Sequence, residues 1–209
     1  MPSYVSIANS AAIAVGTASR LTAPGEDTTL GRAVASVWDL EREAALRDGA
    51  WNFAIKRQSL PALSEAPKHG YARKFQLPTD CLKLIEVYRY PRDYWQLEAR
   101  QIHSNAGAPL DIRYLADITE PAEFDALFAK AFAMRIACAI GNRIAGSSFN
   151  EGLNWQKYQD ALKEARMSDA LENPPIEQAE SAWIEARYAS GGLSESPSAE
   201  YGFGPAGWW

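Results

Sequence analysis

The chain has 209 residues and a formal net charge of −5, with 47% hydrophobic and 22% charged residues. This length and composition suit one sizeable globular domain, or one domain with an appendage. The acidic balance and the lack of any basic run argue against nucleic-acid binding driven by phosphate neutralisation. The amino end lacks the cationic start of a secretory signal, so we interpret its apolar residues as an amphipathic helix.

Two cysteines, Cys81 and Cys138, lie in apolar surroundings without CxxC spacing. We interpret them as buried free thiols, which is consistent with a reducing compartment.

The first quarter of the chain predicts two helices. Residues 4–15 carry apolar side chains at helical spacing and are followed by Gly16. A Pro/Gly linker separates them from a second helix over residues 28–48, which Thr28 or Thr29 begins and Gly49 closes. Residues 51–60 are interpreted as a transition segment.

From Tyr71 the hydrophobic period changes from 3.6 to 2. The pattern predicts short strands over residues 72–76, 82–89, 95–100 and 110–114. Because these strands are too closely spaced for helical crossovers, we expect one small antiparallel meander over residues 71–115, inserted between the second and third helices.

Residues 120–145 predict the central helix, around which the remaining elements pack. We expect Thr119 or Glu120 to cap it. Apolar residues cover most of its surface, and we expect four of them to be nearly fully buried: Phe128, Phe132, Ile136 and Ile140.

A fourth helix is predicted over residues 153–171, with Trp155 and Tyr158 facing inward. Asn173-Pro174-Pro175 ends the compact region, residues 1–172. The predicted fold class is α+β and mostly helical, with a four-helix bundle-like body. Residues 173–209 are predicted to be a flexible, Gly/Ser/Pro-rich C-terminal arm.

The sequence contains few residues in patterns typical of catalytic, cofactor or metal sites. His69 and His103 lack nucleophile partners at any recognised spacing, and no glycine-rich nucleotide loop or metal-ligand cluster occurs. Asp117 and Glu120 form the one acidic pair that suits acid–base chemistry, although helix-start electrostatics is the simpler interpretation. We therefore assign no catalytic, cofactor or metal residue, and expect no enzyme.

Aromatic residues of the arm are the stronger functional signal. They lie among Gly and Pro without core periodicity, and exposed aromatics of this kind commonly anchor interfaces. The candidate interface residues are Trp183, Tyr188, Tyr201, Phe203, Trp208 and Trp209.

The order of elements and several local motifs resemble the tail tubular protein A family, the head-to-tail adaptors of short-tailed phages and prophages. The resemblance covers residues 1–172 and none of the arm. The motifs that carry it are Asn9 and Gly16, Trp51-Asn52-Phe53-Ala54, Tyr71, Leu77-Pro78-x-Asp80-x-Leu82, Trp95-x-Leu97-Glu98, Ile112-Arg113-Tyr114 and Phe124-x-x-x-Phe128.

The resemblance implies a structural virion protein, located in the tail or neck and in the host cytoplasm during assembly. Its partners would be other copies in a ring, commonly a dodecamer, the portal protein, and the tail nozzle and fibre proteins, with no membrane. Duplex DNA would pass through without tight binding, because twelve copies carry a formal charge of about −60. The alternatives are a siphophage-type head-completion connector and, from another class, a small hydrolase using Asp117 and Glu120.

Overall fold

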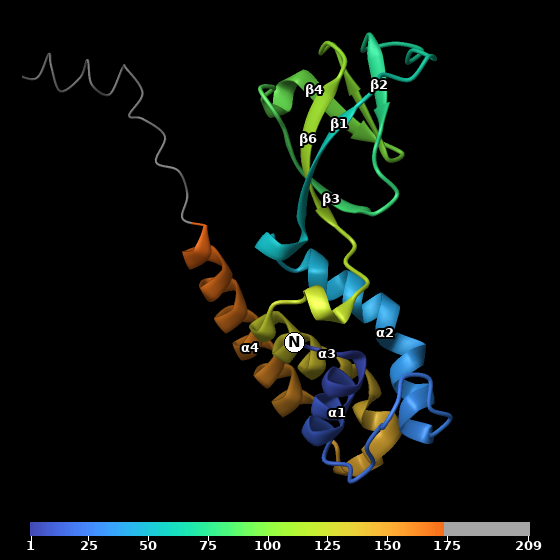
Figure 1. Ribbon diagram of the computed structural model, residues 1–209, viewed down its shortest axis with the longest axis vertical. Helices are drawn as coiled ribbons and strands as arrows, with labels where there is room; N and C mark the ends of the chain where they lie inside the picture. The colour runs from blue at the N-terminus through green and yellow to red at the C-terminus, as the bar shows by residue number, and fades with distance from the viewer. Residues whose placement is uncertain (174–209) are drawn as a thin grey trace, which may run out of the picture. The chain divides into compact units, whose positions relative to one another are not determined.

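The computed structural model describes residues 1–173, and the structural statements below concern that part of the chain. It contains four α-helices and two three-stranded antiparallel sheets, so the α+β class is confirmed (Figure 1). Both sheets are built from the segment between α2 and α3.

The first two helices begin and end where local chemistry favours it. Helix α1 spans Tyr4–Val15; Ser3 and Ser6 form a reciprocal capping box at its start, and Gly16 ends it with a φ of 86°. Helix α2 spans Thr29–Arg47, and the Thr28 side chain accepts a hydrogen bond from the Gly31 N–H.

The central helix α3 begins later than predicted. It spans Ala126–Ala145, whereas Pro121–Glu123 forms a separate 3-10 turn. The prediction that Thr119 or Glu120 caps it is wrong, because Asp125 accepts hydrogen bonds from the Leu127 and Phe128 N–H groups. One carboxylate thus satisfies two of the free donors at the helix start.

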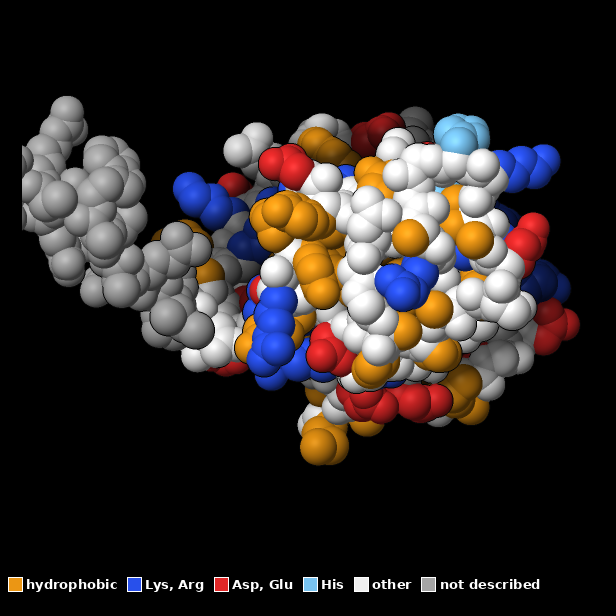
Figure 2. Space-filling view, turned by 90° about the horizontal axis from the view of Figure 1, so that it is seen from above, with side chains coloured by type: hydrophobic (Ala, Val, Ile, Leu, Met, Phe, Trp, Pro, Cys, Tyr) orange, Lys and Arg blue, Asp and Glu red, His pale blue; other side chains and the backbone are white. Residues whose placement is uncertain are grey.

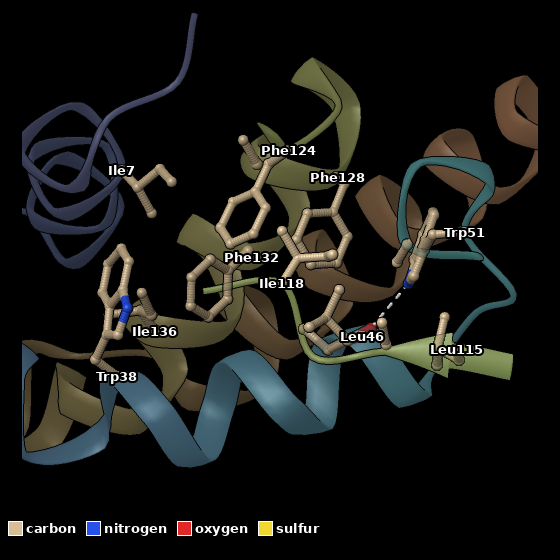
Figure 3. Close-up of a cluster of buried hydrophobic side chains, with 14 of the residues drawn as sticks. Ile7, Trp38, Leu46, Trp51, Leu115, Ile118, Phe124, Phe128, Phe132 and Ile136 are labelled. Atoms are coloured by element: carbon tan, nitrogen blue, oxygen red, sulfur yellow. Dashed lines mark hydrogen bonds between the residues drawn. The ribbon is translucent and has the colours of Figure 1, made fainter. Parts of the chain in front are cut away.

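Helix α3 packs against each of the other three helices. The four side chains predicted for its core are at most 1% exposed, which confirms that prediction. Phe132 lies 5.0 Å from the Trp38 ring centroid in an edge-on contact. Figure 3 shows Phe132 beside Trp38, and Phe128 beside Trp51, whose indole N–H donates to the Ala45 carbonyl at 3.1 Å. Helix α3 therefore organises the core.

Helix α4 spans Glu151–Glu172 and packs on α3. The prediction that Trp155 faces inward is wrong, since its side chain is 49% exposed. The buried face passes through Asn154, Tyr158 and Ala165, and Trp155 lies at its margin, 5.2 Å from the Tyr158 ring.

The first sheet pairs segments from both ends of the insertion. Its strands are β1 (Ile55–Leu60), β3 (Cys81–Val87) and β6 (Leu110–Ala116), in the order β1-β6-β3. Residues 51–60 were predicted to be a transition segment, and that prediction is wrong for β1. Four consecutive residues of β1 are exposed, so the strand has no alternating pattern, and its pairing with β6 is long-range.

The second sheet contains β2 (Arg73–Gln76), β4 (Trp95–Glu98) and β5 (Gln101–Ser104), in the order β2-β5-β4. The single meander predicted over residues 71–115 is therefore wrong in topology, because two sheets share those strands. Sheet and helices meet where Arg47 donates to the Leu82 carbonyl at 2.8 Å. Of the two free cysteines, Cys81 is buried and Cys138 half-buried.

Candidate interaction surface

Residues 88–95, which link β3 to β4, gather exposed aromatic and arginine side chains. We call this segment, Tyr-Arg-Tyr-Pro-Arg-Asp-Tyr-Trp, the aromatic–arginine loop. Tyr88 and Tyr94 are 53% and 58% exposed, and Arg89 and Arg92 are exposed as well. Tyr, Trp and Arg are the residue types that contribute most to protein interfaces, so the composition favours a protein-binding surface.

Backbone contacts hold the loop in place. The Tyr88 N–H donates to the Asp111 carbonyl at 2.9 Å, and the Tyr94 N–H donates to Pro91 at 3.0 Å. The Ser104 hydroxyl donates to the Tyr94 carbonyl at 2.9 Å. Arg89 adopts a φ of 65°, a left-handed conformation that is uncommon for a residue with a Cβ. The tyrosines and arginines therefore project from a defined backbone.

Trp95 is the last residue of this loop and the first of β4, and its indole nitrogen lacks an acceptor among the described residues. The residue is 7% exposed, and the Arg92 guanidinium stacks 3.9 Å from its ring centroid. Within residues 1–173 the buried Trp95 Nε1 has no hydrogen-bond partner. A buried donor without an acceptor is destabilising by about 1–3 kcal/mol, so this N–H is a position where an incoming acceptor is favoured.

A hollow of about 390 Å³ adjoins the loop, lined by Ile85, Val87, Arg89, Tyr90, Arg92 and Trp95 among others. Ile85 and Val87 of β3 contribute apolar lining, and Arg89 and Arg92 of the loop contribute cationic side chains. Glu86 also lines it and lies 3.2 Å from the Arg113 Nε. The site thus combines apolar surface, two guanidinium groups and one unpaired N–H.

The charges of the chain are unevenly distributed between sheets and helices. Residues 55–116 hold ten Lys/Arg and six Asp/Glu, a formal charge of +4, whereas the rest of the described chain holds ten and fifteen, or −5. Figure 2 shows the strand-bearing end of the molecule, where hydrophobic side chains lie between Lys/Arg and Asp/Glu side chains. The chain therefore has a net negative charge although one segment, residues 55–116, has a net positive charge.

The two acidic residues of the alternative hydrolase hypothesis lie in different settings. Asp117 accepts hydrogen bonds from Arg42 at 3.1 and 2.9 Å, and the Arg42 side chain is 6% exposed. Asp39 accepts another hydrogen bond from Arg42. Glu120 is exposed before the 3-10 turn. Asp117 is thus engaged in an ion pair that joins α2 to the segment after β6.

The two histidines lie in different settings. His69 is exposed in the loop between β1 and β2, and the ring of His103 on β5 lies 3.7 Å from the Glu98 carboxylate. Among residues 1–173 the structure places no three His, Cys, Asp or Glu side chains so that they suit a metal ion. Nor does this part of the chain contain a helix long and apolar enough to span a membrane.

All six predicted interface residues of the arm lie outside the described residues: Trp183, Tyr188, Tyr201, Phe203, Trp208 and Trp209. The aromatic–arginine loop was not predicted, because residues 82–89 were interpreted as one strand. A usable signal was present, since residues 88–95 include four aromatic and two arginine side chains around Pro91.

Comparison with models of known protein families gives no match, and comparison with curated protein sequences gives no significant match. The resemblance to the tail tubular protein A family is therefore a hypothesis that depends on the motifs quoted above.

Proposed function

We propose that the chain is a structural virion protein, a head-to-tail adaptor that forms a ring between the portal and the tail nozzle and lets the genome pass. The observation that carries this proposal is the opposite formal charge of two parts of one chain, +4 over residues 55–116 and −5 over the remaining described residues. The motif resemblance adds the particular place in the virion.

A ring requires two different, complementary surfaces on each subunit, because its contacts are heterologous. A basic part and an acidic part on one chain meet this requirement, since the basic part of one copy attracts the acidic part of the next. The aromatic–arginine loop supplies exposed Tyr and Arg side chains in the basic part. Like-charge repulsion disfavours a twofold pairing of either part with itself.

Within the subunit, we assign the four helices to a bundle-like body. Contacts of α3 with α1, α2 and α4 support this arrangement. The sheets between α2 and α3 then present the basic surface, while the helices carry the acidic one. The whole chain remains acidic, which favours passage of duplex DNA over its retention.

The test is co-elution of the purified chain with portal rings in size-exclusion chromatography with light scattering, at 50 mM and 500 mM salt. We expect co-elution at low salt and less at high salt, because screening weakens contacts between exposed charges. Failure to co-elute at both salt concentrations would overturn the proposal. A stable twofold dimer of the free chain at all protein concentrations would also overturn it.

A further inference from the structure

We propose that the hollow beside the aromatic–arginine loop binds the acidic arm, residues 174–209, of a neighbouring copy through its glutamate carboxylates. This inference rests on the proposed ring, because it names the segment that joins one subunit to the next. The interaction pairs Arg89 and Arg92 with the arm and gives the Trp95 N–H an acceptor.

The unpaired Trp95 N–H defines the chemistry of the occupant. It needs an acceptor, and the exposed guanidinium of Arg92, 3.9 Å from the ring centroid, attracts an anion. A carboxylate meets both needs, since it accepts several hydrogen bonds and pairs with guanidinium.

The arm has the matching composition. Residues 174–209 contain five glutamates and one arginine, a formal charge of −4, against +4 for residues 55–116. They also contain six aromatic residues, which suit the exposed Tyr88 and Tyr94 rings. Fully extended, 36 residues span at most roughly 120–130 Å, so the length of the arm does not limit its reach.

Nucleic acid is the less favourable occupant. Glu86 lines the hollow and Asp93 is exposed in the loop, so a duplex with its dense phosphates would meet two carboxylates there. Five glutamates spread over 36 residues carry a much lower density of negative charge than a duplex and so meet less repulsion there. The experiment includes DNA as a competitor.

The probe is a labelled peptide of residues 174–209, titrated by fluorescence anisotropy against the full-length chain. Glu→Gln substitutions at all five glutamates of the receptor's own arm prevent it from competing. We expect the peptide to bind at low salt, and a peptide with the same five Glu→Gln substitutions to bind at least about tenfold more weakly. Equal binding of the two peptides would overturn the proposal.

Receptor variants locate the site. Arg89→Glu with Arg92→Glu should weaken binding at least about tenfold, and Trp95→Phe, which keeps a ring but removes the N–H, by about fivefold. The matched control, Arg57→Glu in β1 with Lys68→Glu in the loop between β1 and β2, makes the same charge change elsewhere and should stay within about twofold. If the control weakens binding as much as the arginine pair, the hollow is not the site.

Circular dichroism checks that each variant folds. If Trp95→Phe does not fold, the binding measured for the Arg89→Glu, Arg92→Glu variant decides whether the hollow is the site. Displacement of the peptide by an equimolar short duplex would assign the site to phosphate and overturn the proposal. Co-elution with portals without peptide binding would reject this inference alone, whereas peptide binding without portal co-elution would reject the adaptor function alone.

Discussion

Arg135 joins three helices through a half-buried network of polar side chains. Arg135 donates to Glu41 at 2.6 Å, to Asp48 at 2.8 Å and to the Tyr158 hydroxyl at 2.8 Å. Tyr158 donates in turn to Asp48 at 2.5 Å. Burial, with the hydrogen bond to Asp48, raises the pKa of Tyr158 to about 12. These side chains connect α2, α3 and α4.

The raised pKa of Tyr158 predicts a loss of stability in alkali. The unfolded phenol titrates near pH 10, so its contribution is complete below about pH 10 and is lost as the pH rises towards 12. A shift of about two pKa units is equivalent to roughly 2–3 kcal/mol. We expect Tyr158→Phe to lose about 1–2 kcal/mol at pH 8 and to decline less between pH 9 and 11.5. Urea unfolding of both proteins across this pH range measures the effect. An equal dependence of the unfolding free energy on pH in the two proteins would contradict the prediction.

The ion pair of Arg42 with Asp117 is expected to contribute to stability. Its buried guanidinium pairs with Asp117 at 2.9 Å, whereas Arg32 makes an exposed pair with Asp27 at the same distance. We expect Arg42→Ala to cost about 2–4 kcal/mol, because it leaves a partly buried carboxylate unpaired. Arg32→Ala should cost less than about 1 kcal/mol. Denaturant unfolding measures both, and similar losses for the two would contradict the assigned role.

Among the elements, the linker from α3 to α4 packs its Phe149 ring against a glycine of α3, Gly141. A Cβ atom at Gly141 would lie 2.2 Å from a ring carbon of Phe149, whereas one at Gly152 in α4 meets nothing closer than 3.8 Å. We expect Gly141→Ala to destabilise the chain by about 1–3 kcal/mol through overpacking. Gly152→Ala should stabilise it by roughly 0.5–1 kcal/mol. Thermal unfolding checks the pair, and stabilisation by both would contradict the close packing of Gly141 on Phe149.

The sequence predicts elements best where their periodicity is complete. Helix α3 repeats apolar residues on nearly every turn, so its core residues Phe128 and Phe132 follow directly. Strand β1 has no such pattern, because four of its six residues are exposed and its pairing partner is β6, some fifty residues away. Long-range pairing of this kind leaves little local signal.

The candidate site was partly present in the sequence. Tyr88, Arg89, Arg92 and Tyr94 are visible as a cluster, but the apolar residues before them, Leu82, Leu84, Ile85 and Val87, suggested a strand that continues through Arg89. The unpaired Trp95 N–H and the stacked Arg92 are properties of the three-dimensional arrangement. Sequence reasoning instead selected the aromatic residues of the arm, which lie outside the described residues.

At the scale of the whole molecule, charge separation predicts weak contacts with DNA. The sheet-bearing part carries +4 and the complete chain −5. We expect the free chain to bind duplex DNA weakly, with affinity that disappears at moderate salt. A gel shift in low salt checks this, and sub-micromolar affinity would contradict it.

Electron microscopy of the full-length chain mixed with its portal tests the adaptor role most directly. We expect a closed ring of subunits docked on one end of the portal, with each subunit making two different contacts with its neighbours. Portals that remain bare in the presence of excess chain, or that carry isolated twofold dimers, would contradict the adaptor assignment.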